Sequence, residues 1–147
     1  MKSTRIDTRP ATVNDAAGIA RLISDLGYPC TTNQMRSRLS ALANDAAYAT
    51  FVACVDRTLA GMAGAFVGRI YEQDDPMGRI IALSVSNDFR RIGLGRQLVQ
   101  AAENWIRSRG ASIVLVNSGF DREDAHKFYE RAGYSAKGAS FIKQLPQ

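Results

Sequence analysis

One segment in the middle of the chain constrains the fold more than any other: an apolar run, a glycine turn, an amphipathic helix and a second apolar run. Residues 79–86 are almost continuously apolar, which predicts a strand that is central in its sheet and buried on both faces. Residues 94–109 place apolar side chains on one face at helical spacing, and Gly110 ends this helix. Residues 113–116 then predict a short buried strand. This order is typical of a fold that mixes α-helices and β-strands.

Further helices and strands are predicted on both sides of this unit. Thr12 and Asp15 resemble a helix-capping pair, and apolar residues follow at helical spacing until Gly27. The other expected elements are a strand at 5–9, a helix at 32–44, a hairpin of strands at 50–55 and 59–71, a loop at 72–78, a helix at 124–132 and a last strand at 139–145. On the long helix, the expected apolar face consists of Leu94, Leu98, Ala101, Ala102 and Trp105.

Length and composition indicate one globular domain over residues 1–147, since 147 residues with 46% hydrophobic side chains suffice for a single compact core. No run approaches the roughly 18 apolar residues of a membrane span, and the first residues lack the apolar stretch of a secretory signal. We therefore expect a cytoplasmic protein without a membrane partner. Cys30 and Cys54 stand singly and His126 is the one histidine, so we expect neither a metal site nor a disulfide framework.

The turn before the long helix carries the clearest sign of a ligand. Residues 90–96 read Arg-Arg-Ile-Gly-Leu-Gly-Arg, and a helix that starts after a glycine turn leaves amide groups available to an anion. Three arginines in this turn favour a diphosphate over a lone carboxylate. The segment is neither a P-loop nor a dinucleotide fingerprint, because it lacks Gly-Lys-Ser/Thr and has Leu98 in place of a third glycine. Taken alone, it is also compatible with an ordinary strand-to-helix turn.

The charge balance favours a phosphate-bearing partner. The chain carries 19 Lys and Arg against 14 Asp and Glu, a net charge of +5, and most of its cations are arginines. Outside residues 90–96 these basic residues are scattered, whereas a nucleic-acid-binding face gathers them with aromatic side chains between. We therefore expect no nucleic-acid partner. A steep salt dependence of oligonucleotide binding would contradict that expectation.

Three spaced motifs follow one another along the chain. They are Arg9-Pro10-Ala11-Thr12 with Asp15, Arg90-x-x-Gly93-x-Gly95 after a strand, and Ala125-x-x-Phe128-Tyr129-x-x-x-Gly133-Tyr134. Together they resemble the GNAT family of N-acetyltransferases, which transfer an acetyl group from acetyl-CoA to an amine, and the resemblance covers nearly the whole chain. It implies the acyl-CoA N-acyltransferase fold, a central mixed β-sheet with about four helices on its two faces. Residues 124–129 are most similar to small-molecule members such as the aminoalkylphosphonate and aminoglycoside types.

The resemblance also assigns roles to individual residues. Backbone amides of residues 91–96 would bind the CoA pyrophosphate, and the strand backbone at 83–85 would pair with the pantetheine arm. Tyr129 would be the general acid that protonates the departing thiolate, and a core tyrosine with a satisfied hydroxyl is the alternative. The positions implied for acetyl-CoA binding are Leu83, Ser84, Val85, Arg90, Arg91, Ile92, Gly93, Leu94, Gly95, Arg96, Asn117, Arg122, Ala125, Phe128 and Tyr129.

The chain departs from the family pattern on the central strand. Many members have a glutamate there that takes the proton of the amine, and Ile81 and Ala82 stand at that place in this chain. The general base is therefore unassigned, and its candidates are Glu72, Asp74, Asp75 or ordered water. A second departure is Arg122, which stands where many members have an asparagine that contacts pantetheine. It would reach a CoA phosphate or a substrate anion, or lie in solvent.

The implied function is acetyl transfer to a primary amine of a small molecule by direct attack in a ternary complex, since no activated nucleophile is present. The acidic residues Glu72, Asp74 and Asp75 would attract a cationic acceptor, whereas Arg69 and Arg79 would hold the anionic group of a zwitterionic one. A protein or peptide acetyltransferase and a non-catalytic acyl-CoA sensor are the other hypotheses. Family members are often homodimers, and residues 140–145 would offer a strand edge to a second copy.

Overall fold

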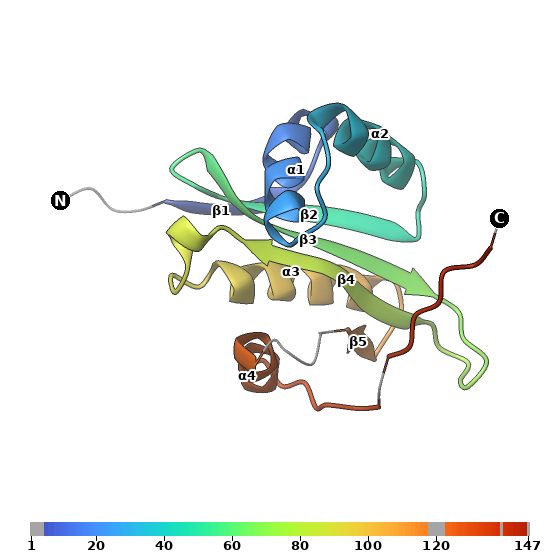
Figure 1. Cartoon of the computed structure of the whole chain (residues 1–147). Helices are drawn as coiled ribbons and strands as arrows, with labels where there is room; N and C mark the ends of the chain where they lie inside the picture. Colours follow the sequence, from blue (N-terminus) through green and yellow to red (C-terminus); the bar gives the residue numbers. More distant parts are fainter. Residues whose placement is uncertain (1–4, 118–122, 139, 147) are drawn as a thin grey trace. The chain divides into compact units, whose positions relative to one another are not determined.

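The computed structural model describes residues 5–117, 123–138 and 140–146, and Figure 1 shows its elements. They are the strand β1 (Ile6–Pro10), the 3-10 helix η1 (Val13–Asp15), the helices α1 (Ala16–Asp25) and α2 (Thr32–Ala43), the strands β2 (Tyr48–Val55), β3 (Thr58–Gly68) and β4 (Met77–Val85), the 3-10 helix η2 (Asn87–Phe89), the helix α3 (Leu94–Ser108), the strand β5 (Val114–Val116) and the helix α4 (Glu123–Arg131). The chain divides into two compact units, Met1–Val116 and Asn117–Gln147. The expectation of one domain over residues 1–147 stays a prediction.

The five strands form one mixed sheet in the order β1-β2-β3-β4-β5. Neighbours are antiparallel from β1 to β4, and residues 78–80 of β4 pair in parallel with β5. This parallel pair with α3 as its crossover is the strand–helix–strand unit that the sequence predicts. In the first unit, α1 and α2 lie on one face of the sheet and α3 lies on the other (Figure 1). The expectation of a mixed sheet with helices on both faces is confirmed.

Among the described strands, β4 is not the central, doubly buried strand that its sequence predicts. β3 is the middle one of these strands, since it pairs with β2 on one side and with β4 on the other. The side chain of Ile81 is 51% exposed, since the apolar cluster under α1 and α2 includes Ala82 but not Ile81. β5 is half-buried rather than buried, because it is the last strand of the described sheet.

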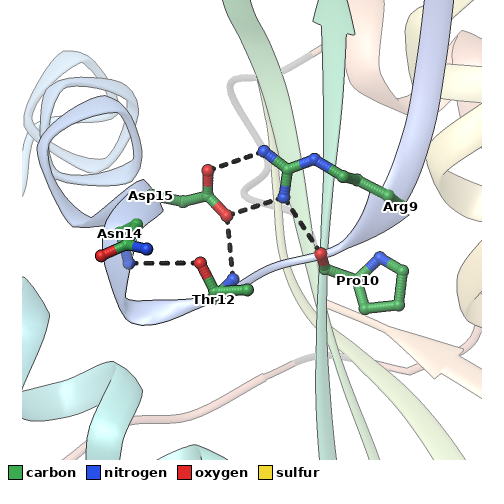
Figure 2. A network of polar contacts seen from close by, with 5 residues as sticks. All are labelled: Arg9, Pro10, Thr12, Asn14 and Asp15. Atoms are coloured by element: carbon green, nitrogen blue, oxygen red, sulfur yellow. Dashed lines mark hydrogen bonds and ion pairs between the residues drawn. The ribbon is translucent and has the colours of Figure 1, made fainter.

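The predicted capping pair forms at the start of η1, which leads into α1. Thr12 Oγ1 accepts a hydrogen bond from Asn14 N at 3.2 Å, and Asp15 Oδ2 accepts one from Thr12 N at 2.8 Å (Figure 2). The Arg9 guanidinium donates two bonds of 2.9 Å to the Asp15 carboxylate, whose side chain is only 10% exposed. This hydrogen-bonded ion pair lowers the pKa of Asp15 and raises the pKa of Arg9.

α2 begins with a second capping box. Thr31 Oγ1 accepts a hydrogen bond from Gln34 N at 3.1 Å, and Gln34 Oε1 accepts one from Thr31 N at 2.9 Å. Together α1 and α2 bury one apolar cluster against the sheet. Its buried members are Ala16, Ile19, Ala20, Leu22, Met35, Leu39, Val52 and Met62.

α3 packs closely on the opposite face, and this closeness requires glycine in the sheet. Its buried side chains are Leu94, Leu98, Val99, Ala102 and Ile106. The predicted apolar face lacked Val99 and Ile106, which the helical period of 3.6 residues brings onto the same side. A Cβ on Gly61 would lie 2.9 Å from Leu98 Cδ1, and a Cβ on Gly78 would overlap Ile106. The two glycines therefore let α3 approach β3 and β4.

β2 and β4 each begin two residues before their predicted starts, at Tyr48 and Met77, and two other predicted strands differ more from the structure. β3 ends at Gly68 rather than at Tyr71, whose side chain is fully exposed. Described residues 140–146 form no strand, and the side chains of Phe141 and Ile142 are 94% and 96% exposed. A strand needs a partner strand, and the second unit, to which this segment belongs, has none among its described residues. In the described part of the chain, no helix is long and apolar enough to cross a membrane.

Candidate functional site

The segment between β4 and α3 turns through two residues with left-handed backbone. Ser86 precedes η2, and its Oγ accepts a hydrogen bond from Asp88 N at 3.4 Å. Arg91 then has a φ of 67° and Gly93 a φ of 88°. Glycine adopts such values readily, whereas at Arg91 the left-handed backbone costs about 1–2 kcal/mol. Strain of this kind clusters at ligand sites, which makes residues 90–96, the glycine loop, a candidate.

The glycine loop leads into a helix start that no described side chain caps. Gly93 is the N-cap of α3 and accepts only the helical bond from Gln97 N at 3.1 Å. First-turn amides lack partners inside a helix and carry the positive end of its dipole. A Cβ built on Gly93 would have no described atom within 4 Å, so the space over this turn is open. Arg90, Arg91 and Arg96 are exposed around it, and these features fit a diphosphate.

β4 parts from β5 before it reaches the glycine loop. β5 pairs only with residues 78–80, so residues 81–85 have no described strand on that side. The register with β3 shifts at Ile81, which is left over between the paired residues Ile80 and Ala82. A β-bulge of this kind bends a strand and re-aims the groups that follow it.

Beyond the bulge, the backbone of β4 directs hydrogen-bonding groups to the open side. Ser86 N donates to Ala60 O at 2.7 Å, toward β3. Successive residues of a strand alternate in direction, so the amides of Leu83 and Val85 point away from β3. Residues 83–85, the open edge of β4, can therefore pair with an extended ligand as a further strand would.

The side chains of the open edge belong to the core. Leu83 and Val85 pack against the buried cluster that includes Leu94 of α3. Ser84 is 7% exposed, and its Oγ donates to Leu22 O of α1 at 3.4 Å. Leu83 and Val85 can thus offer a ligand their backbone amides, which is the role that the family resemblance implies for this strand, whereas Ser84 pairs with Met62 of β3.

The second unit carries the predicted general acid, Tyr129, on α4. The Tyr129 ring packs edge-to-face on Phe128 and on Tyr134, with centroids 5.3 Å and 5.8 Å apart. Tyr134 N donates to Tyr129 O at 2.9 Å, which closes the end of the helix. The acid role of Tyr129 stays a prediction. The other predicted acetyl-CoA contacts from this part of the sequence are the half-buried Ala125, the exposed Asn117, and Arg122, which lies outside the described residues.

The three candidate bases lie at the other end of β4. Glu72, Asp74 and Asp75 are exposed in the loop before β4, whereas the glycine loop follows its far end (Figure 1). A strand rises about 3.3 Å per residue, so the stretch from Met77 to Leu83 separates these carboxylates from the open edge by roughly 20 Å. The structure thus brings together the open edge and the glycine loop, and it does not bring these carboxylates to them.

Two features of the site have no signal in the sequence. The bulge at Ile81 depends on how β3 and β4 pair, which a single sequence does not show. The left-handed backbone at Arg91 is equally hidden, because glycine and asparagine rather than arginine mark such positions. Both could be found only after the strands were placed.

An open strand edge beside an uncapped helix start fits an extended ligand that bears a diphosphate. Acetyl-CoA has this form, with a long pantetheine arm attached to a diphosphate. The family profile described as "Acetyltransferase (GNAT) family" matches residues 18–134, and the chain belongs to this family. It is therefore an acetyl-CoA-dependent acyltransferase that acts on amines.

Relatives and solved structures agree with this assignment. YhdJ of Bacillus subtilis, an uncharacterized N-acetyltransferase, is 25% identical over 125 residues, which cover 84% of this chain and 87% of that protein. The aminoalkylphosphonate N-acetyltransferase of Salmonella typhimurium is 36% identical over 69 residues, 47% of this chain and 45% of that protein. A solved aminoglycoside N-acetyltransferase in complex with CoA shares the fold, with a TM-score of 0.86 and 16% identity over 98% of this chain and 97% of its own.

Proposed function

We propose that this chain transfers the acetyl group of acetyl-CoA to a primary amine of a small molecule, by direct attack in a ternary complex. The observation that carries the proposal is the open edge of β4 beside the uncapped start of α3. The names of two similar proteins, an aminoalkylphosphonate and an aminoglycoside N-acetyltransferase, support a small acceptor.

Different residues of the chain bind different parts of the extended ligand. Bound acetyl-CoA supplies an acetyl group activated as a thioester. First-turn amides of α3 and the arginines of the glycine loop hold the diphosphate. The amides of Leu83 and Val85 hold the arm, and one of them donates to the acetyl oxygen as negative charge develops there. Tyr129 protonates the departing thiolate, and the protein gains further rate by holding the amine beside the thioester.

The attacking amine must first lose a proton, and the side chain of Ile81 cannot accept it. An alkylamine has a pKa near 10.4, so only a small fraction is neutral at pH 7. Because the three loop carboxylates lie at the other end of β4, we expect water at the open edge to accept the proton. The value of kcat/KM should then rise with pH toward the pKa of each acceptor amine. A profile that levels off at the same pH for every acceptor indicates a base fixed in the protein.

The test is thiol release from acetyl-CoA across polyamines, aminoglycosides, amino acids, aminophosphonates and basic peptides. Turnover with small amines supports the proposal, and turnover with peptides alone would show a protein acetyltransferase instead. If calorimetry shows that the protein binds acetyl-CoA but no acceptor in the panel releases thiol, the result contradicts the proposal and favours a non-catalytic acyl-CoA sensor.

The role of Tyr129 is tested by Tyr129→Phe, with Tyr134→Phe as the control because the two rings are neighbours. We expect Tyr129→Phe to lower kcat at least tenfold with unchanged acetyl-CoA binding, since general acid catalysis contributes about 10²–10⁴-fold. Tyr134→Phe should keep its kcat. Equal kcat values for the two variants would remove Tyr129 from the acid role.

We also propose that residues 140–146 contact a second copy of the chain. Phe141, Ile142 and Leu145 are 94%, 96% and 79% exposed, and such a group of apolar side chains is typical of a contact surface. Light scattering after size-exclusion chromatography should give twice the chain mass of 16.0 kDa. The double variant Phe141→Asp, Ile142→Asp should then be monomeric, and a monomeric wild type would contradict the proposal.

A further inference from the structure

A row of side chains crosses the sheet on the face that α1 and α2 partly cover. Tyr48 of β2 pairs with Phe66 of β3, and Phe66 pairs with Arg79 of β4. Directly paired residues share a face, and the ring centroids of Tyr48 and Phe66 are 5.1 Å apart. By strand alternation, Phe66 shares its face with Met62, which is buried under α1 and α2. The row presents two aromatic rings and one guanidinium on this face.

Ile81 extends this surface toward the open edge of β4. Its side chain is 51% exposed and lies over Gly64, where a built Cβ would be 3.3 Å from Ile81 Cγ1. Leu83 and Val85 point to the opposite face, where they pack with the cluster of α3. Because α3 covers that face, a small molecule reaches the open edge over Ile81 and the row.

Arg79 is a charge on this surface that has no partner among the described residues. Its side chain is half-buried, and within residues 5–117, 123–138 and 140–146 no hydrogen bond, ion pair or cation–π contact involves it. Arg69 differs, because it is exposed and its Nη1 donates to Asp74 O at 3.1 Å. A half-buried charge loses hydration, and proteins normally pair such a group. The position of Arg79 therefore points to an anionic ligand.

We propose that Arg79 binds the anionic group of the acceptor, and that the acceptor is a small amine that carries a carboxylate or a phosphonate. The inference rests on the proposed function. The planar guanidinium binds either anion through two parallel hydrogen bonds. The apolar atoms of the acceptor lie on Ile81 and Phe66, and its amine reaches the open edge.

A polycationic acceptor fits this surface less well. Arg79 repels a second ammonium group that approaches over the row. The carboxylates Glu72, Asp74 and Asp75, which would attract such an acceptor, are exposed in the loop before β4. Exposed carboxylates bind a cation weakly, because water screens the charge.

The experiment compares acceptors that differ only in the anion: 3-aminopropionate with its neutral amide, and an aminoalkylphosphonate with its neutral diester. Initial rates are measured for the wild type, Arg79→Gln, Arg79→Lys and the control Arg69→Gln. We expect Arg79→Gln to raise KM for the anionic acceptors about tenfold or more, with kcat and the neutral acceptors changed less than about twofold. Arg79→Lys should be intermediate, and Arg69→Gln should match the wild type.

Equal KM values for charged and neutral acceptors in the wild type would overturn the proposal. An Arg79→Gln variant that loses activity equally on charged and neutral acceptors would overturn it as well. Preference for polyamines would overturn it too. Thermal unfolding of Arg79→Gln establishes that the variant is folded. Calorimetry of the aminoalkylphosphonate in the presence of CoA tests Arg79 even without turnover. If no transfer is detected but the aminoalkylphosphonate binds Arg79→Gln tenfold more weakly than the wild type, the anion site is supported. Equal binding to the wild type and to Arg79→Gln overturns it.

Discussion

The helical segments η1, α2 and α3 start in two opposite ways. At η1 and α2, the side chain of the N-cap threonine accepts a hydrogen bond from an amide of the first turn. The side chain of Asp15 or Gln34 accepts one in return from the backbone amide of that threonine. At α3, Gly93 brings no side chain, no described residue caps the amides, and Arg91 just before it is strained. A missing cap costs about 1 kcal/mol of stability. The capped starts use their amides within the fold, whereas the amides at the start of α3 remain available to a ligand.

The largest effect is expected from a side chain in the space over the uncapped start. Gly93→Val places a branched side chain where the diphosphate binds and on a backbone with a φ of 88°. We expect acetyl-CoA binding, measured by calorimetry, to weaken about a hundredfold or more.

Gly27→Val is the matched control for this variant. Gly27 also has a positive φ, 102°, and open space around a built Cβ, but it lies after α1. Both variants should lose about 1–2 kcal/mol of unfolding free energy, and only Gly93→Val should lose acetyl-CoA binding. Equal binding losses in the two variants would mean that strain, not the site, is responsible.

The capped start should show the reverse pattern. Asp15→Ala removes the acceptor of two Arg9 bonds and one Thr12 bond, so we expect urea unfolding to show a loss of about 1–3 kcal/mol. Acetyl-CoA binding should stay within about twofold of the wild type. Asp7→Ala is the control, because its ion pair with Arg5 is exposed and should contribute much less. A binding loss in Asp15→Ala as large as in Gly93→Val would break the comparison.

The capped start should also respond to acid. The pKa of Asp15 is lowered by its hydrogen bonds from Arg9, so the unfolded chain takes up the proton first as the pH falls. The stabilisation is complete above the unfolded pKa of about 3.9 and is lost below it, toward the folded pKa. The stability difference between the wild type and Asp15→Asn in urea should be constant from about pH 7 to 5 and shrink below about pH 4. A difference that does not change down to about pH 2 contradicts this.

The smallest effect concerns strain at the uncapped start. Arg91→Gly relieves the left-handed backbone, whereas Arg90→Gly acts at an ordinary φ of −74° and only adds chain entropy to the unfolded state. Both remove one arginine from the same loop, so charge effects cancel. We expect Arg91→Gly to be more stable than Arg90→Gly by about 1 kcal/mol. Equal stabilities would show that Arg91 is not strained.

The features that the sequence predicted correctly are local. Thr12 and Asp15 are three residues apart, so their capping pair follows from spacing alone, and the same holds for the glycine loop before an amphipathic helix. The features that it missed depend on neighbouring strands. The middle place of β3 and the bulge at Ile81 follow from pairing, and residues 140–146 have strand-like alternation without a described partner. The sequence gives Arg69 and Arg79 the same predicted role. The structure distinguishes them, because Arg79 pairs with Phe66 in the sheet and Arg69 donates a hydrogen bond to Asp74 O.

The central claim is that the uncapped start of α3 and the open edge of β4 together bind acetyl-CoA. Backbone amide resonances of isotope-labelled protein, followed during titration with acetyl-CoA, test it residue by residue. We predict large shifts for Leu83, Val85 and the amides of residues 93–96, and small shifts for the capped starts at residues 12–15 and 31–34. Unchanged resonances at the open edge and the glycine loop, in protein saturated with acetyl-CoA, would contradict the account.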